Sequence, residues 1–168
     1  RFSAMLKLLA RCVLSGILLA TPVWLHAQAN CADDAPGRQE YQRIVSVGGA
    51  ITETLYALRQ GHRVVATDTT SYFPEAAKKT PKVGYQRTLS AEGILSTRPD
   101  LIVASDQAGP PAVIRQLKAS GLTFRTLPTA SDLAQVIDNI RALSALLCAV
   151  QAGEDLVMAL QNERNKLP

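Results

Sequence analysis

The stretch RIVSVGGAITETLYAL, residues 43–58, passes from a β-branched run into a helical pattern across two glycines. Residues 43–47 are typical of a buried strand, and residues 51–58 are typical of an amphipathic helix. The alternation continues along the chain, with strands expected at 64–67, 101–104 and 123–127 and helices at 90–96 and 112–120. This order predicts a Rossmann-like α/β fold, in which a parallel sheet is flanked by helices on both faces.

The first 29 residues predict a cleavable secretory signal peptide. Basic residues at 1, 7 and 11 precede an apolar run from 12 to 25, and small residues follow at 27 and 29. A transmembrane anchor is disfavoured, because the run is shorter than the roughly 20 apolar residues that a span needs. Removal of residues 1–29 leaves 15 basic against 14 acidic residues, so the charge gives no support to nucleic-acid binding. We therefore expect a periplasmic protein.

The remaining chain predicts one lobe followed by helices. Residues 30–42 are polar and predict a flexible leader, and the α/β lobe is expected over 43–150. From 131 onward apolar residues recur at helical spacing, with Ser131 or Asp132 as the N-cap. A second helical stretch, 155–167, becomes polar without a capping residue, so residues 151–168 are interpreted as the start of a truncated helix.

The cysteines and histidines carry little functional information. An oxidising compartment permits a disulfide between Cys31 and Cys148 without implying one, and Cys148 is expected to be a buried small hydrophobe in an apolar helical stretch. His62 follows a glycine on the side away from the strand ends, and we expect it at the surface. No spacing typical of zinc or manganese ligands remains. The basic cluster of Lys78, Lys79 and Lys82 is interpreted as a solvated face around a turn.

Ligands of a parallel sheet bind beyond the carboxyl ends of its strands, which selects the loops 48–50, 68–72, 84–87 and 105–111. The two glycines at 48 and 49 predict a tight turn where the backbone approaches a ligand, since the GxGxxG pattern of dinucleotide-binding proteins is missing. The strand-end loops contain no paired carboxylates and no nucleophile beside a base, so we do not expect an enzyme. The candidate cleft residues are Gly48, Gly49, Thr69, Thr70, Asp106 and Gln107.

The segment VGYQRTLS, residues 83–90, places a phenol and a guanidinium two residues apart just before a helix. A phenolate suits ferric iron, and tyrosine is an axial ligand in some haem proteins. The ordinary pKa of a phenol is about 10, so ligation at neutral pH requires stabilisation of the charged form, by the metal and by a nearby cation such as Arg87. Arg87 could instead pair with a haem propionate. Taken alone, the residues favour an ordinary loop tyrosine, Tyr85, with a surface arginine.

Residues 43–128 resemble the N-terminal lobe of the periplasmic haem-binding proteins of ABC haem importers. These are class III substrate-binding proteins, with two α/β lobes joined by one long helix. The RPDL element belongs to the wider siderophore and cobalamin class, whereas GYQR is more particular to haem. The segments that carry the resemblance are RIVSVGG (43–49), TETLYAL (52–58), DTTS (68–71), GYQRTLSAEGIL (84–95) and RPDLI (98–102).

The resemblance implies that Tyr85 ligates the iron of ferric haem and that Arg87 supports the phenolate. Glu92 matches the acidic residue that docks onto an arginine pocket of the permease; it is also a favourable charge at a helix N-terminus. The implied function is that of a monomeric periplasmic protein that delivers haem, its transported ligand, to an ABC permease with its ATPase. A siderophore or cobalamin cargo on the same fold is the nearest alternative. An exported α/β enzyme is the alternative from another class.

Overall fold

Four short strands form one parallel sheet in the order β2-β1-β3-β4. The computed structural model describes residues 40–166, and its strands are β1 (Ile44–Val47), β2 (Val64–Thr67), β3 (Leu101–Ser105) and β4 (Thr123–Leu127). Each strand lies at a run that the sequence predicts to be a strand. The predicted signal peptide and residues 30–39 of the predicted leader lie outside the described residues.

The strand β1 occupies the interior of the sheet, between β2 and β3. All of its residues are buried, as expected for a strand that helices cover on both faces. Side chains alternate between the two faces with a period of two. Accordingly, Ile44 enters the apolar core on one face, while Val45 and Val47 enter the core on the other.

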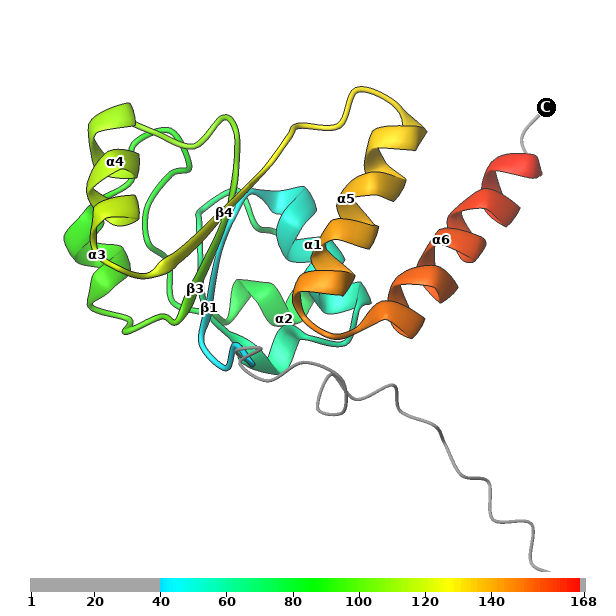
Figure 1. Cartoon of the computed structure of the whole chain (residues 1–168), viewed down its shortest axis with the longest axis horizontal. Helices are drawn as coiled ribbons and strands as arrows, with labels where there is room; N and C mark the ends of the chain where they lie inside the picture. Colours follow the sequence, from blue (N-terminus) through cyan, green and yellow to red (C-terminus); the bar gives the residue numbers. More distant parts are fainter. Residues whose placement is uncertain (1–39, 167–168) are drawn as a thin grey trace, which may run out of the picture.

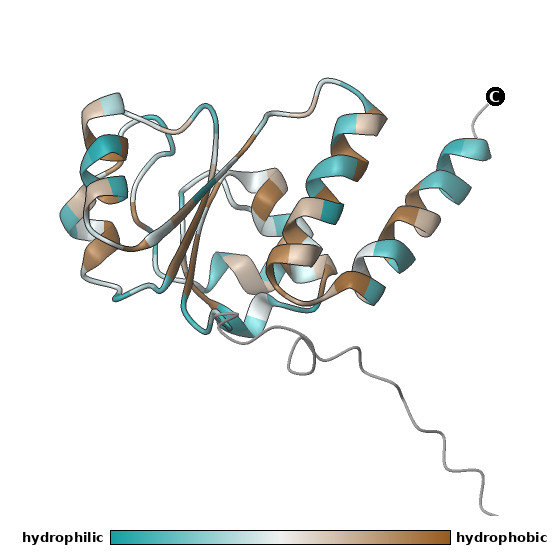
Figure 2. Ribbon diagram, in the orientation of Figure 1, coloured by the Kyte–Doolittle hydropathy of each residue, from teal (hydrophilic) through white to brown (hydrophobic). Residues whose placement is uncertain are grey.

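The helices form layers on the two faces of the sheet (Figure 1). One face carries α1 (Gly49–Ala57) and α5 (Leu133–Leu146), with α6 (Val150–Asn165) packed against α5; the other carries α3 (Ala91–Leu95) and α4 (Pro111–Ala119). The short helix α2 (Glu75–Lys78) and the 3-10 turn η1 (Gly61–Arg63) complete the helical elements of the described residues. Figure 2 shows the interior strands of the sheet, β1 and β3, as largely apolar. The predicted Rossmann-like α/β fold is confirmed.

Two side-chain caps decide where helices begin. The hydroxyl of Ser90 accepts a hydrogen bond from the backbone N of Gly93 at 3.2 Å, and the carboxylate of Asp132 accepts one from Gln135 N at 2.8 Å. Such a cap satisfies a backbone N–H group that the first helical turn leaves without a partner. Of the two predicted caps at 131 and 132, the structure therefore selects Asp132.

The helical tail breaks earlier than the sequence predicts. Cys148 has a φ of 58°, and the second helix starts at Val150 rather than at 155. Cys148 is half-buried and disulfide-bonded, so its interpretation as a buried small hydrophobe was wrong. Cys31 lies outside the described residues.

The helices α5 and α6 approach each other closely. A side chain at Gly153 would overlap the Ser144 side chain, so only glycine permits this crossing. The Arg141 guanidinium pairs with both carboxylate oxygens of Glu154, at 2.8 and 3.0 Å. Across residues 40–166, no helix combines the length and the apolar character needed to cross a membrane.

The folded lobe includes Tyr41, two residues before its predicted start at residue 43. Tyr41 is part of the core under α1 and α5. The carboxylate of Asp100 accepts hydrogen bonds from Gln42 N at 2.8 Å and Arg43 N at 3.0 Å. The Arg43 guanidinium donates in turn to the carbonyl of Arg98 at 2.9 Å and to that of Thr97 at 2.7 Å. These contacts tie the entry of β1 to the turn before β3.

Replacement of Asp100 by alanine should lower the free energy of unfolding by about 1–2 kcal/mol, because two backbone N–H groups lose their acceptor. Urea denaturation followed by circular dichroism measures this change. The control is Asp138→Ala, which removes an exposed α5 carboxylate that has no hydrogen-bond partner among the described residues and should leave stability unchanged or slightly raised. Equal stability of the Asp100 variant and the wild type would contradict the expectation.

Candidate functional site

The carboxylate of Asp68 ties together the loops at the carboxyl edge of the sheet. Asp68 follows β2 directly, and its side chain is fully buried. Its Oδ1 accepts hydrogen bonds from Gly48 N at 2.9 Å and the Ser71 hydroxyl at 2.8 Å. Its Oδ2 accepts from the backbone N and the hydroxyl of Thr70, at 2.9 and 2.5 Å. These four donors offset the cost of removing the charge from water, so Asp68 joins the loop after β1 to the loop after β2.

A chain of buried hydroxyls leads to this carboxylate. The hydroxyl oxygen of Thr52 lies 2.7 Å from that of Ser46 and 2.7 Å from that of Ser71. Because the single proton of Ser71 is donated to Asp68, Ser71 accepts from Thr52, and Thr52 accepts from Ser46. The chain therefore runs in one direction, from β1 through α1 to the β2 loop. Buried networks with every member satisfied make a structure rigid.

The two glycines after β1 form the predicted tight turn. Gly48 has a φ of 120°, which glycine adopts without strain. A Cβ at Gly48 would lie 3.3 Å from the Cβ of Ser105, and one at Gly49 would lie 3.1 Å from the Thr70 carbonyl oxygen. The turn is therefore packed against the ends of both neighbouring strands.

The loop that carries Tyr85 is held on two sides by backbone hydrogen bonds. Thr69 N donates to the carbonyl of Gly84 at 2.9 Å, which joins the loop to the segment after β2. Gly109 N donates to the carbonyl of Gln86 at 2.9 Å, which joins it to the segment before α4. The loop is thus joined to the segment that follows β2 and to the segment that follows β3, at the carboxyl edge of the sheet.

Tyr85 and Arg87 occupy one turn, which a hydrogen bond from Thr88 N to the Tyr85 carbonyl closes at 2.9 Å. The Tyr85 side chain is 44% exposed, and Arg87 is exposed as well. Neither the phenol nor the guanidinium has a hydrogen-bond partner among residues 40–166. The backbone of the turn is fixed while both functional groups are available to a ligand.

A pocket of about 450 Å³ opens beside this turn. This volume lies within the range of about 300–1,000 Å³ found for small-molecule sites. Tyr85 itself is not among the lining residues, although the next two residues of its loop are. The pocket is lined by Gly48, Gly49, Ala50, Ile51, Thr54, Gln86, Arg87, Ser105, Gln107, Leu127, Pro128, Thr129, Ala130, Val136 and Asn139.

The six predicted cleft residues divide into two groups. Gly48, Gly49 and Gln107 line the pocket. The other three, Thr69, Thr70 and Asp106, do not; the Thr70 hydroxyl is used by Asp68.

Asp106 joins the ends of β3 and β4. Its Oδ1 accepts hydrogen bonds from the Thr129 hydroxyl at 2.6 Å and from Thr129 N at 3.1 Å. These bonds, the hydroxyl first, lower the pKa of Asp106 below its ordinary value. The residue thus shapes the wall that Pro128 and Thr129 form, rather than presenting a free carboxylate.

Helix residues in the pocket wall were missed by sequence reasoning. Val136 and Asn139 of α5 and Thr54 of α1 line the pocket, and the Asn139 amide donates to the Pro128 carbonyl at 2.8 Å. The sequence shows only that these residues belong to expected helices. Which helix face meets the strand ends depends on how α5 packs.

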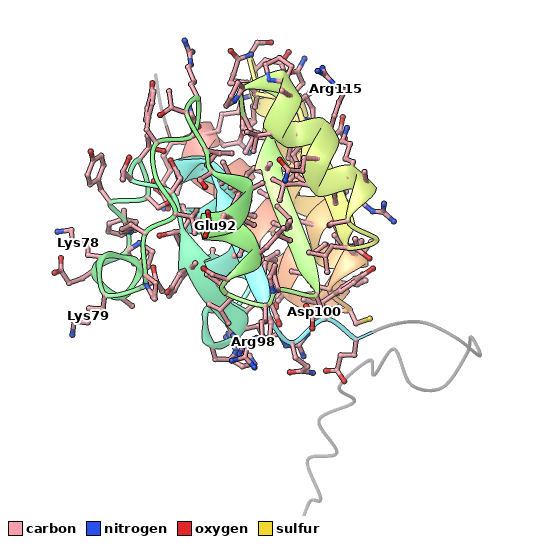
Figure 3. All side chains as sticks on the ribbon, turned by 90° about the vertical axis from the view of Figure 1, so that its left-hand side faces the viewer. Lys78, Lys79, Glu92, Arg98, Asp100 and Arg115 are labelled. Carbon is pink, nitrogen blue, oxygen red and sulfur yellow. The ribbon has the colours of Figure 1, made fainter. Side chains whose placement is uncertain are left out.

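Glu92 lies where the sequence predicts it, exposed in the first turn of α3. Figure 3 shows it on the face that carries α3 and α4, between Lys78 and Lys79 at one edge and Arg115 at the other. Its carboxylate makes no hydrogen bond or ion pair with another described residue, so it is available to a partner.

All three lysines of the basic cluster are exposed, as the sequence predicts. Lys78 and Lys79 are exposed and project from the body of the protein (Figure 3). The exposed Lys82 differs from the other two in its contacts, because its ammonium group donates hydrogen bonds to three protein oxygens, on Thr67, Ser71 and Ala77.

His62 is exposed, as predicted, with its Nδ1 3.1 Å from the Arg59 carbonyl. The part of the chain that the structure describes has no group of three or more His, Cys, Asp or Glu residues that could hold a metal ion.

Known binding proteins are similar to this chain over about half of their own length. The periplasmic haem-binding protein BhuT, solved in complex with two haems, is 43% identical with a TM-score of 0.70, covering 74% of this chain and 47% of that one. The periplasmic vitamin B12-binding protein BtuF of Vibrio cholerae is 31% identical with a TM-score of 0.65, covering 75% and 51%. A curated vitamin B12-binding protein of Vibrio cholerae serotype O1 is 33% identical over 113 residues, 67% of this chain and 41% of the relative.

The family model described as periplasmic binding protein matches residues 44–167. The match starts at the first residue of β1 and extends past the end of α6, so it includes every strand of the sheet and the strand-end loops. The resemblance seen in the sequence is confirmed at this level. The chain belongs to the periplasmic binding protein family.

Proposed function

We propose that this chain captures ferric haem outside the cytoplasm and passes it to an ABC permease with its ATPase. Membership in a family of binding proteins agrees with the prediction that the chain is not an enzyme. The haem cargo is supported by the 43% identity to a haem-binding protein, against 31% to a vitamin B12-binding protein of the same fold.

The observation that carries the proposal is the free phenol of Tyr85 on a fixed turn. An exposed hydroxyl without a protein partner pays no cost of broken hydrogen bonds when it binds iron. The turn beneath it is held by backbone bonds to the neighbouring loops, so little motion has to be arrested on binding. A phenolate is a hard anionic ligand that suits ferric iron.

Arg87 lies two residues after Tyr85 on the same turn, and its guanidinium has no hydrogen-bond partner among the described residues. A fixed positive charge near the phenolate favours the charged form of the ligand. The same group could pair with a haem propionate, because a guanidinium matches carboxylate geometry. In either role Arg87 contributes charge without binding the iron.

The pocket suits part of a flat, largely apolar macrocycle. Ile51, Leu127 and Val136 supply apolar surface, while the amides of Gln86 and Gln107 supply polar groups. Apolar walls with a few polar groups are typical of small-molecule sites. We assign Gly48, Gly49 and Gln107 to this contact surface, and assign Thr70 and Asp106 to the support of its loops.

Delivery requires a surface for the permease, and we assign the exposed carboxylate of Glu92 to it. This chain covers 41% and 47% of the length of two of its relatives, and we propose that a second lobe supplies the opposite wall of the cleft. Residues 43–150 then form one lobe, and α6 starts the connecting helix. The protein acts as a monomer in the periplasm, exported by residues 1–29.

Vitamin B12 is the main rival cargo, because a curated relative with that ligand is 33% identical. A siderophore is a further rival on the same fold. Both would be held by loop contacts without a bond from the protein to the metal, so neither needs the Tyr85 phenol. An exported enzyme is the rival from another class.

Replacement of Tyr85 by phenylalanine should abolish the charge-transfer absorption of tyrosinate-bound ferric haem. Affinity should fall by more than the roughly 10–100-fold that loss of a group supporting a metal ligand costs. The experiment is a spectrophotometric haem titration of the full-length protein. Tyr56→Phe is the matched control, since its ring lies against Gly61, before β2 and outside the strand-end loops, and should have no effect. An unchanged spectrum and affinity in the Tyr85 variant would remove the ligand assignment.

Replacement of Arg87 by alanine should keep the tyrosinate band but weaken haem binding by about 10–100-fold. The band should also be lost at a higher pH during acidification, because the phenolate loses a stabilising cation. An acid titration of the haem complex measures both effects. Arg115→Ala, an exposed position on α4, serves as the control. A midpoint that does not move would refute the electrostatic role.

Titration of the apo-protein with ferric haem, cyanocobalamin and a ferric siderophore should give binding with haem alone. Isothermal calorimetry measures all three cargoes under the same conditions. Tighter binding of cobalamin than of haem would transfer the function to the rival cargo. Chemical conversion of any of the three ligands by the protein would favour the alternative that the protein is an exported enzyme.

A further inference from the structure

Lys82 is the one cation of its cluster whose ammonium group is fully engaged by the protein. Its Nζ lies 2.7 Å from the Thr67 hydroxyl oxygen, 3.0 Å from the Ala77 carbonyl and 3.2 Å from the Ser71 carbonyl. An ammonium group has three donors, and all three are used here. The acceptors come from the end of β2, from the loop that follows it and from α2.

The backbone of Lys82 is fixed as well. Lys82 forms an isolated parallel bridge with Thr67; Thr67 N donates to the Pro81 carbonyl at 2.9 Å, and Val83 N donates to the Thr67 carbonyl at 3.0 Å. The chain thus returns to the edge of the sheet at Lys82, three residues before Tyr85.

Partial burial of this charge has an electrostatic cost. Burial lowers the pKa of Lys82, and the negative charge of Asp68 acts in the opposite direction. The three hydrogen bonds of the Lys82 ammonium group offset this cost, and they hold together the segment from Thr67 to Lys82.

Ser71 connects Lys82 to the rest of the site. Its carbonyl accepts from Lys82, while its hydroxyl donates to Asp68 at 2.8 Å. Asp68 in turn holds Gly48 N, at the pocket wall. One ammonium group is thereby linked to the pocket wall through Ser71 and to the Tyr85 loop through its own backbone.

We infer that Lys82 is a positioning residue, whose ammonium group holds the Tyr85 loop in place relative to the Gly48 turn without touching the ligand. The inference rests on the proposed function only for the identity of the cargo. The position of the loop is a property of the ligand-free protein and can be measured without haem.

The test compares Lys82→Met with Lys79→Met in the full-length protein. Methionine retains most of the hydrocarbon stem and removes the donors. Lys79 is an exposed neighbour whose ammonium group has no hydrogen-bond partner among residues 40–166. Two readouts are taken: amide hydrogen exchange of the apo-protein, and the rate of haem loss with the charge-transfer spectrum of the ferric complex.

In the Lys82 variant, amides of residues 67–71 and 83–88 should exchange faster, because the opening of this segment becomes less costly. Haem loss should accelerate about 10-fold or more, the size of effect expected for the loss of charge-assisted hydrogen bonds, and the tyrosinate band should shift. The Lys79 variant should match the wild type. Lys82→Arg retains a cationic donor, so its exchange and haem-loss rates should lie between those of the Lys82→Met variant and the wild type. It replaces Lys82→Met in the test if that variant does not fold.

Unchanged exchange in both Lys82 variants would overturn the inference. Faster exchange with an unaltered haem-loss rate and spectrum would also overturn it, since Lys82 would then stabilise the loop without positioning the ligand. If the wild type binds no haem, the proposed function fails, and the exchange data alone decide whether Lys82 holds the loop.

Discussion

The buried carboxylate of Asp68 is the constraint on which the ligand-facing edge of this protein depends. A charge removed from water is tolerated only where hydrogen bonds replace its hydration. Here every donor comes from the loops themselves, from Gly48, Thr70 and Ser71. The loops after β1 and β2 therefore cannot separate without exposing an unsatisfied charge. The hydroxyl chain through Thr52 extends the same constraint into the core under α1.

The side chains that hold the loops together and the side chains that remain without a protein partner are different residues. Asp68 and Lys82 use their polar atoms within the protein, whereas Tyr85, Arg87 and Glu92 leave theirs without a partner among the described residues. A site built this way is organised before the ligand arrives, so less ordering entropy is lost on binding. It also explains how a turn can be rigid in its backbone and reactive in its side chains.

Local features were predictable where their cause is local. The strands follow from runs of β-branched residues, the cap at Asp132 from a polar side chain before a helical run, and the glycine turn from a position that needs φ above zero. Predictions failed where partners lie far apart in the chain. Cys148 was expected to be a buried small hydrophobe, and the second tail helix was expected to begin after Val150. In each case a contact or a backbone angle that the segment itself does not specify decided the outcome.

By itself, the sequence determined the order of strands and helices, the edge of the sheet where the loops gather, and the pairing of a phenol with a guanidinium on one turn. Only the tertiary structure decided which of those loop residues support the site and which face the pocket, and that α5 supplies a wall. The physical reason is that periodicity and capping depend on hydrogen bonds within one segment. A buried carboxylate or a saturated ammonium depends instead on donors and acceptors that packing brings together from several segments.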